Sequence, residues 1–302
     1  MSDGAAVELT VLNMMLSADF DESIQRHRQS GLHWVDLWGD IYGAPSVDLL
    51  DPPTAGRAAA AIEAAGLEVY CLSTRVFDDY VEQGEQSYRE KHLGQLERSL
   101  ALAERLGPRF VRLIAGRSRR TDPSADAVAV LQADHPWVAD VYREAVARIT
   151  EAGYRATIEN EAHDCFLASG DEFVRFFDWL DLGDAVSLTW DVQNNWQMGV
   201  FPSLAAYETL KPLIGYVHVK GGQSGERSSE LAWKTALADA SWPVAEIVQA
   251  VVDDGVSPVI CLNPSHGAAK PGYDYGRGSD RDLEEVTRRD IDFLRRTVAG
   301  IR

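Results

Sequence analysis

Ionisable side chains occur on three successive apolar segments in the second half of the chain. Glu159 closes the segment 154–160, Asp191 closes 185–191, and His218 lies within 214–220. Two carboxylates and one imidazole suit a divalent ion such as Mn²⁺, Co²⁺, Mg²⁺ or Zn²⁺ and leave coordination positions for a substrate. Each group alone could equally be a polar residue hydrogen-bonded to loop backbone. Their occurrence on three consecutive segments predicts one divalent metal site.

The elements that must position these residues alternate regularly along the chain. Short β-branched or aromatic runs predict strands at 7–16, 33–38, 67–74, 110–116, 154–160, 185–191, 214–220 and 257–263. Helical patterns follow them at 19–31, 54–66, 85–106, 135–152, 170–181, 203–211, 242–254 and 280–298. Thr54 is the expected N-cap of the second helix. The amides that follow Asp191 are a poor start for a helix, so we expect a loop there.

Eight strand–helix units predict an α/β protein with a parallel sheet, and this length favours a single (β/α)8 TIM barrel over a doubly wound sheet. No Gly-rich phosphate-binding fingerprint opens the first unit. No low-complexity tract divides the chain, so we expect one domain over residues 1–302. Reactive groups of such barrels lie at the carboxyl ends of the strands, and adjacent strands are about 4.8 Å apart. The three candidate ligands can therefore converge.

Composition restricts the class of partner. The net charge of −18 over 302 residues repels phosphate backbones and anionic lipid, so neither nucleic acid nor membrane is an expected partner. The three cysteines are far apart without CxxC spacing, and the N-terminus lacks a signal-peptide pattern. We therefore expect a cytoplasmic protein with reduced thiols. The sequence leaves the oligomeric state open, including an assembly of identical chains.

Three motifs together resemble those of the xylose isomerase-like TIM barrels, the sugar phosphate isomerase/epimerase superfamily. "ATIEN" resembles their fifth strand, which ends in a metal-binding Glu at the place of Glu159. "SLTWDVQNN" is similar to their sixth-strand motif and aligns Asp191 with a metal ligand, and "GYVHVKGG" does the same for His218. The resemblance implies a barrel fold and a divalent-metal enzyme that acts on a carbohydrate-like small molecule.

Two positions depart from the family pattern. Asn194 stands where the family commonly has a His, and Asn263 stands where its eighth strand ends in a metal-binding Glu. An amide oxygen can bind a metal but cannot act as a base. The fourth ligand could thus be Asn263, His266 or water, and His266 is our candidate for the second catalytic proton carrier beside Glu159. Glu161 is an alternative acid or base, with a structural role equally open.

The resemblance implies an isomerase or epimerase that moves a proton next to a carbonyl. A lyase of the same superfamily is the main rival, either inosose-dehydratase-like or the barrel subunit of a C-glycoside-cleaving enzyme. A non-catalytic carbohydrate-binding barrel is the third reading. Four residues near the strand ends are substrate-binding candidates: Trp38, Asn194, Trp196 and Lys220. Core packing is the alternative for the tryptophans, and an outward orientation is the alternative for Lys220.

Overall fold

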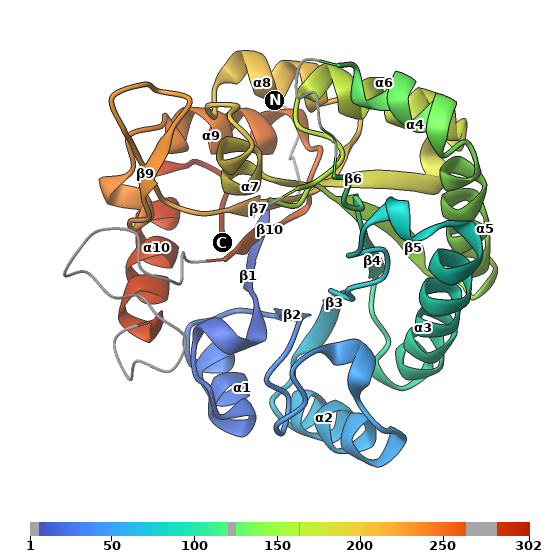
Figure 1. The fold of residues 1–302 in the computed structure, drawn as a ribbon. Helices are drawn as coiled ribbons and strands as arrows, with labels where there is room; N and C mark the ends of the chain where they lie inside the picture. The colour runs from blue at the N-terminus through green and yellow to red at the C-terminus, as the bar shows by residue number, and fades with distance from the viewer. Residues whose placement is uncertain (1–5, 120–124, 163, 264–282) are drawn as a thin grey trace.

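The computed structural model describes residues 6–119, 125–162, 164–263 and 283–302. Within these ranges, eight parallel strands form one sheet in the order β1-β10-β7-β6-β5-β4-β3-β2. These strands are β1 (Glu8–Val11), β2 (Trp34–Leu37), β3 (Glu68–Leu72), β4 (Phe110–Ile114), β5 (Arg155–Glu159), β6 (Val186–Asp191), β7 (Ile214–Val219) and β10 (Val259–Leu262). The sheet curls into a nearly closed barrel, which confirms the predicted fold (Figure 1).

Helices surround the barrel (Figure 1). The described helices are α1 (Phe20–Gln29), α2 (Pro52–Ala64), α3 (Glu85–Leu106), α4 (Ala127–Asp134), α5 (Trp137–Glu151), α6 (Gly170–Leu180), α7 (Val192–Gln197), α8 (Leu204–Leu210), α9 (Val244–Asp254) and α10 (Leu283–Thr297). Their apolar faces and the strands share one large buried core. None of the helices in the described ranges has the length and apolar character that crossing a membrane requires.

The two end strands of the sheet, β1 and β2, are joined by side-chain as well as backbone contacts. Leu12 and Asp36 form an isolated parallel bridge between them. Asn13 donates from its amide to the Gly39 carbonyl at 2.7 Å and accepts from the Trp38 N–H at 2.9 Å. A short 3-10 helix, Asn13–Met15, begins at this residue. The expected strand over 7–16 is therefore too long.

Two helix starts also differ from expectation. The N-cap of the second helix is Asp51, three residues before the expected Thr54, because Asp51 accepts the Thr54 N–H at 2.7 Å and a proline occupies the first turn. The predicted helix 135–152 is α5, which begins at Trp137, and α4 precedes it as a separate helix.

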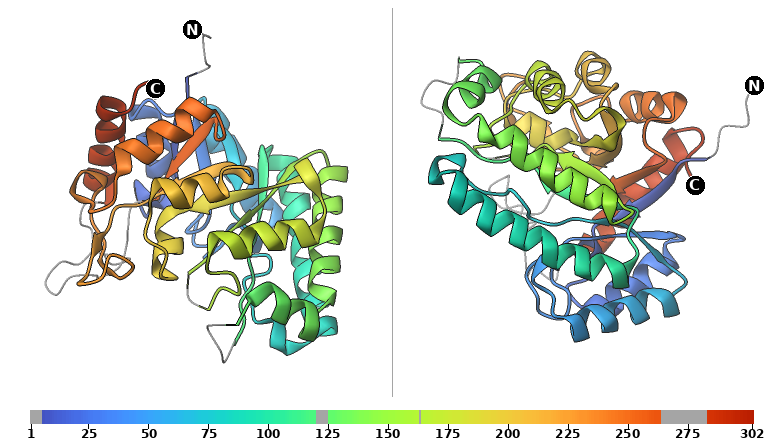
Figure 2. Two further views of the ribbon diagram at one scale, coloured as in Figure 1. Left: turned by 90° about the horizontal axis from the view of Figure 1, so that it is seen from above. Right: turned by 90° about the vertical axis from the view of Figure 1, so that its right-hand side faces the viewer.

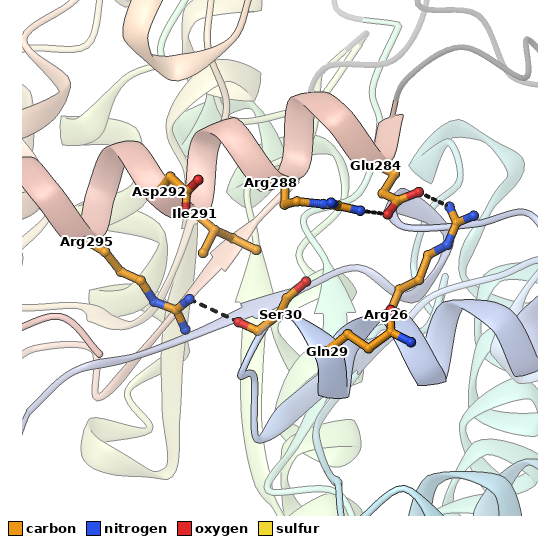
Figure 3. Close-up of a pocket in the computed structure, with 8 residues that line it drawn as sticks. All are labelled: Arg26, Gln29, Ser30, Glu284, Arg288, Ile291, Asp292 and Arg295. Carbon is orange, nitrogen blue, oxygen red and sulfur yellow. Dashed lines mark hydrogen bonds and ion pairs between the residues drawn. The ribbon is translucent and has the colours of Figure 1, made fainter.

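The chain ends pack beside each other. Val7 forms a parallel bridge with Ile301, and Figure 2 shows β1 next to the C-terminal segment. The first and last helices enclose an outer groove of about 250 Å³, where Arg26 pairs with Glu284 at 2.6 Å (Figure 3). In the same groove, Arg295 donates to the Ser30 carbonyl at 3.0 Å. These contacts join the two ends of the barrel's helical layer.

A short antiparallel hairpin follows the seventh barrel strand. It consists of β8 (Gln223–Ser224) and β9 (Leu231–Trp233), and no sequence pattern predicted it. Gly222, at the base of the hairpin, lies against the Trp196 ring, and an added Cβ would come within 2.8 Å of that ring. Glycine is therefore required for this close approach.

Candidate functional site

The three predicted ligands converge at the carboxyl ends of adjacent strands. The Nδ1 atom of His218 lies 3.1 Å from Oε1 of Glu159 and 3.9 Å from Oδ2 of Asp191. One ligand atom from each residue lies within 4.8 Å of the other two. All three side chains are at most 3% exposed. Such burial of two carboxylates requires compensating positive charge.

Strand pairing brings these residues together. Asp191 and His218 are directly paired in the β6–β7 register, and Glu159 is paired with Thr189, two residues before Asp191. Parallel strands place neighbouring carboxyl ends at the same rim. Alternation along β6 then turns Asp191 toward the barrel axis on the same side as Glu159.

Asp191 also begins a helix, contrary to the loop we expected. Its Oδ1 accepts the N–H groups of Gln193 at 3.1 Å and Asn194 at 2.9 Å, so it is the N-cap of α7. This capping offsets the poor helix propensity of the amide run. It also leaves the other carboxylate oxygen, Oδ2, directed at the ligand cluster. One side chain therefore has both a structural and a site role.

Buried cations neutralise both carboxylates. The Arg112 guanidinium, from β4, pairs with Oε2 of Glu159, and the two side chains are 4% and 3% exposed. Lys220 Nζ lies 2.7 Å from Oδ2 of Asp191. Burial raises the pKa of Glu159, but Arg112 and His218 outweigh burial and lower this pKa to about 2. Burial lowers the pKa of Lys220, and Asp191 raises it overall.

The far side of the His218 ring faces another carboxylate. Its Nε2 lies 3.4 Å from Oδ2 of Asp36, and neither side chain is exposed. Burial lowers the pKa of His218, but Glu159 and Asp36 raise it to about 9. Asp36, His218 and Cys261 form a second group with metal-ligand atoms close together. Burial raises the pKa of the Cys261 thiol, which makes the thiolate needed for metal binding unfavourable.

The first cluster fits a divalent ion in ligand type and spacing. With bonds of about 2.1 Å, ligand atoms of one ion lie about 3 to 3.5 Å apart. The 3.1 Å and 3.9 Å separations from His218 Nδ1 are close to that range. Asn263, directly after β10, is buried, and its Oδ1 has no hydrogen-bond partner among the described residues. That orphaned oxygen is available as a ligand.

A polar cavity of about 210 Å³ opens beside the cluster. Trp38, Asn194 and Lys220 line it, as a substrate-binding role requires, and so does Asn263. Trp196 is absent from its lining. That residue is buried, and its indole nitrogen donates to the Ser228 carbonyl at 2.9 Å. Among the described residues, the lining consists of Leu12, Met15, Trp38, Arg112, Glu159, Glu161, Ala162, Asn194, Gln197, Lys220, Lys234 and Asn263.

Glu161 lies in this cavity with its carboxyl group held in place. Its Oε1 accepts from the Asn194 amide at 3.0 Å and from the Ala162 N–H at 2.8 Å. Burial and the nearby Glu159 carboxylate raise the pKa of Glu161 to about 7. Asn194 also accepts from Lys220 Nζ at 3.1 Å, which links this carboxyl group to the metal-ligand cluster. His266 lies outside the described residues.

Three site residues were missed from the sequence: Asp36, Arg112 and Lys234. Asp36 and Arg112 are charged residues inside otherwise apolar runs, which is the signal that identified Glu159 and Asp191. They lie before the carboxyl ends of their strands, and only residues at those ends were considered as site candidates. Lys234 follows β9 and reaches the cavity because the hairpin returns toward it. No sequence pattern indicated this hairpin.

Comparisons with known proteins agree with this fold. D-psicose 3-epimerase of Clostridium cellulolyticum H10 with D-tagatose is 14% identical, with TM-score 0.68 and coverage of 96% of this chain and 99% of that one. The 3-keto-D-glucoside 4-epimerase YcjR of E. coli is 16% identical, with TM-score 0.67 and coverage of 96% and 99%. The probable 3-DHS dehydratase AsbF of Bacillus anthracis is 15% identical, with TM-score 0.67 and coverage of 96% and 98%.

These structural similarities establish the shared fold. No curated protein matches the chain in sequence. A family model does match it, over residues 9–297, under the description "Xylose isomerase-like TIM barrel". That match spans nearly the whole chain and agrees with the barrel fold. The chain therefore belongs to the xylose isomerase-like TIM barrel family.

Proposed function

We propose that the chain is a divalent-metal-dependent isomerase or epimerase of a sugar or sugar-like hydroxy-carbonyl compound. The observation that carries this proposal is the convergence of Glu159, Asp191 and His218 beside a polar cavity of about 210 Å³. The cavity's size suits a small molecule rather than a macromolecule. Two epimerases among the structures of similar fold support the reaction class.

The proposed metal ligands are Oε1 of Glu159, Oδ2 of Asp191 and Nδ1 of His218, with the Asn263 side-chain oxygen as the fourth. When bound, a divalent ion supplies Lewis-acid polarisation of a substrate carbonyl. Lys220 Nζ lies 2.7 Å from Oδ2 of Asp191. We propose that, with a divalent ion held by Asp191, the Lys220 ammonium group would be available to contact a substrate oxygen in the cavity.

The carboxyl groups that line the cavity are the proposed proton carriers. Glu161 is the nearer match to a base, because Asn194 and the Ala162 N–H fix one of its oxygens within the cavity. It would take a proton from the carbon next to the carbonyl and return it at the neighbouring position. Glu159 is the alternative carrier. His266, which lies outside the described residues, stays the candidate for the second proton carrier.

A lyase is the second candidate, and Asn263 is the specific observation in its favour. Asn263 lines the cavity at the position where the family commonly has a metal-binding Glu. An amide cannot accept the proton that a two-carboxylate epimerisation moves. Elimination needs one base next to the carbonyl and a departing hydroxyl group. A probable dehydratase is also among the structures of similar fold.

The test measures hydrogen exchange with solvent. Metal-free chain is reloaded with Mn²⁺, Co²⁺, Mg²⁺ or Zn²⁺ and incubated in D₂O with D-fructose, D-tagatose and an inosose. Deuterium next to the carbonyl together with a new aldose supports an isomerase, and together with a new ketose it supports an epimerase. Loss of water from the inosose supports the lyase. A metal-loaded chain that neither exchanges nor converts any of them contradicts both.

Variants locate the proton carrier. Glu161→Gln should reduce exchange at least about 100-fold, the usual scale for removing a general base. Glu63→Gln is the matched control, because Glu63 is exposed on α2. His266→Ala should slow product formation and leave folding unchanged. If Glu161→Gln exchanges hydrogen at the wild-type rate, Glu161 is not the base, and Glu159 becomes the candidate.

A further inference from the structure

The His218 imidazole is held between carboxylates on its two sides. Nδ1 faces Glu159 Oε1 at 3.1 Å, and Nε2 faces Asp36 Oδ2 at 3.4 Å. His218 and Asp36 are both fully buried. A buried carboxylate beside a ring nitrogen controls which nitrogen carries the proton. Asp36 is therefore placed to control the nitrogen that faces the cluster.

Asp36 is itself fixed on both oxygens. The Tyr216 hydroxyl donates to Oδ2 at 2.9 Å, and the Ser73 hydroxyl donates to Oδ1 at 2.5 Å. The Tyr216 ring also packs edge-to-face against the His218 ring, with centroids 4.8 Å apart. Two donors and one ring contact thus hold the carboxylate and the imidazole in one relative orientation.

We infer that Asp36 is a positioning residue of the metal centre: with an ion bound at Nδ1, it would accept the Nε2 proton of His218, so that the Nδ1 lone pair faces Glu159 and Asp191. In this structure the two atoms lie 3.4 Å apart without forming that hydrogen bond, so the ring would have to turn slightly toward Asp36. This inference rests on the proposed function, since it presumes that Nδ1 binds the ion. A carboxylate that accepts from a metal-binding histidine fixes the ring and makes the ligand more basic. Asp36 reaches neither the cavity nor the substrate in this role.

The competing arrangement places the ion on the other side of the ring, between Asp36, His218 Nε2 and Cys261. Asp36 already accepts from Tyr216 and Ser73. The Cys261 thiol donates toward the Leu262 carbonyl at 3.6 Å. The cavity lining includes Glu159 but neither Asp36 nor Cys261. The geometry therefore favours the Nδ1 side.

The first test measures Mn²⁺ affinity by titration calorimetry. Asp36→Asn keeps the shape but removes the charge, and it should weaken Mn²⁺ binding about 10- to 100-fold. Asp48→Asn is the matched control, because Asp48 is also buried and is absent from the cavity lining. It should bind Mn²⁺ as the wild type does. Equal affinity in Asp36→Asn and wild type would overturn the inference.

The second test reads the His218 ring directly and needs no variant, so it decides the question even if Asp36→Asn fails to fold. The ¹⁵N spectrum of the Zn²⁺-loaded wild-type chain should show His218 protonated at Nε2 and metal-bound at Nδ1. Protonation at Nδ1 with the metal on Nε2 would refute the role of Asp36 and support the competing arrangement. Wild-type chain that binds neither Mn²⁺ nor Zn²⁺ would instead refute the proposed metal site, and this inference with it.

Discussion

Replacing Arg112 with Met should destabilise the metal-free protein strongly at neutral pH. Arg112 and Glu159 are 4% and 3% exposed, so solvent screens their interaction little. Removing one partner of such a buried pair costs about 3 to 5 kcal/mol, because the other charge stays buried without compensation. His218, 3.1 Å from the same carboxylate, supplies part of the lost compensation. We therefore expect Arg112→Met to lower the free energy of unfolding by about 3 kcal/mol, the lower end of that range.

The assay is urea unfolding at pH 7, followed by tryptophan fluorescence, for wild type, Arg112→Met, Glu159→Gln and the double variant. Arg112→Met should lower the free energy of unfolding less in the Glu159→Gln background than in the wild type, because no carboxylate is left uncompensated there. Mn²⁺ at 100 times its Kd adds about 2.7 kcal/mol if it binds only the folded chain. A cost below about 1 kcal/mol, or an equal cost in both backgrounds, would refute the reasoning about this pair.

Three further predictions concern the metal, the pH dependence and the domain structure. Asn263→Glu should raise Mn²⁺ affinity at least about tenfold, because a carboxylate binds a hard divalent ion better than an amide does; weaker binding in calorimetry would place Asn263 away from the ion. Burial lowers the pKa of His92 to about 4. The unfolded chain therefore binds more protons between pH 6.5 and pH 4, and His92→Gln should lessen the acid-induced loss of unfolding free energy by about 3 kcal/mol. The same pH dependence in both chains would contradict this. Limited proteolysis should give no two stable halves, as one domain over 1–302 requires, and two independently folded fragments would show otherwise.

The position of each ionisable residue within its strand determined whether the sequence could predict its place in the site. Glu159 and Asp191 stand at the ends of apolar runs, and the (β/α)8 rule alone places such ends at one rim. Asp36 and Arg112 interrupt their runs earlier, where an ionisable residue is as consistent with an exposed edge as with a barrel interior. Only the three-dimensional pairing with His218 and Glu159 shows that these charges are buried and compensated.

The sequence did not predict local structure where one capping side chain outweighed the weak helix propensity of the residues after it. Asp191 caps α7 through two backbone N–H groups, so amides with weak helix preference still form a helix. Trp196 belongs to that helix, and its buried ring packs at the base of the β8–β9 hairpin rather than in the cavity. Strand alternation after His218 left the direction of Lys220 open. Its ion pair with Asp191 fixes it toward the site.

The central claim is that Glu159, Asp191 and His218 together bind one divalent ion. The most direct measurement is an anomalous difference map from crystals of the wild-type chain soaked in Zn²⁺ and recorded at the zinc edge. We predict one strong peak at about 2.0 to 2.2 Å from Glu159 Oε1, Asp191 Oδ2 and His218 Nδ1. A crystal with no peak there at saturating Zn²⁺, or with its peak on the Asp36 side of the His218 ring, would contradict the account.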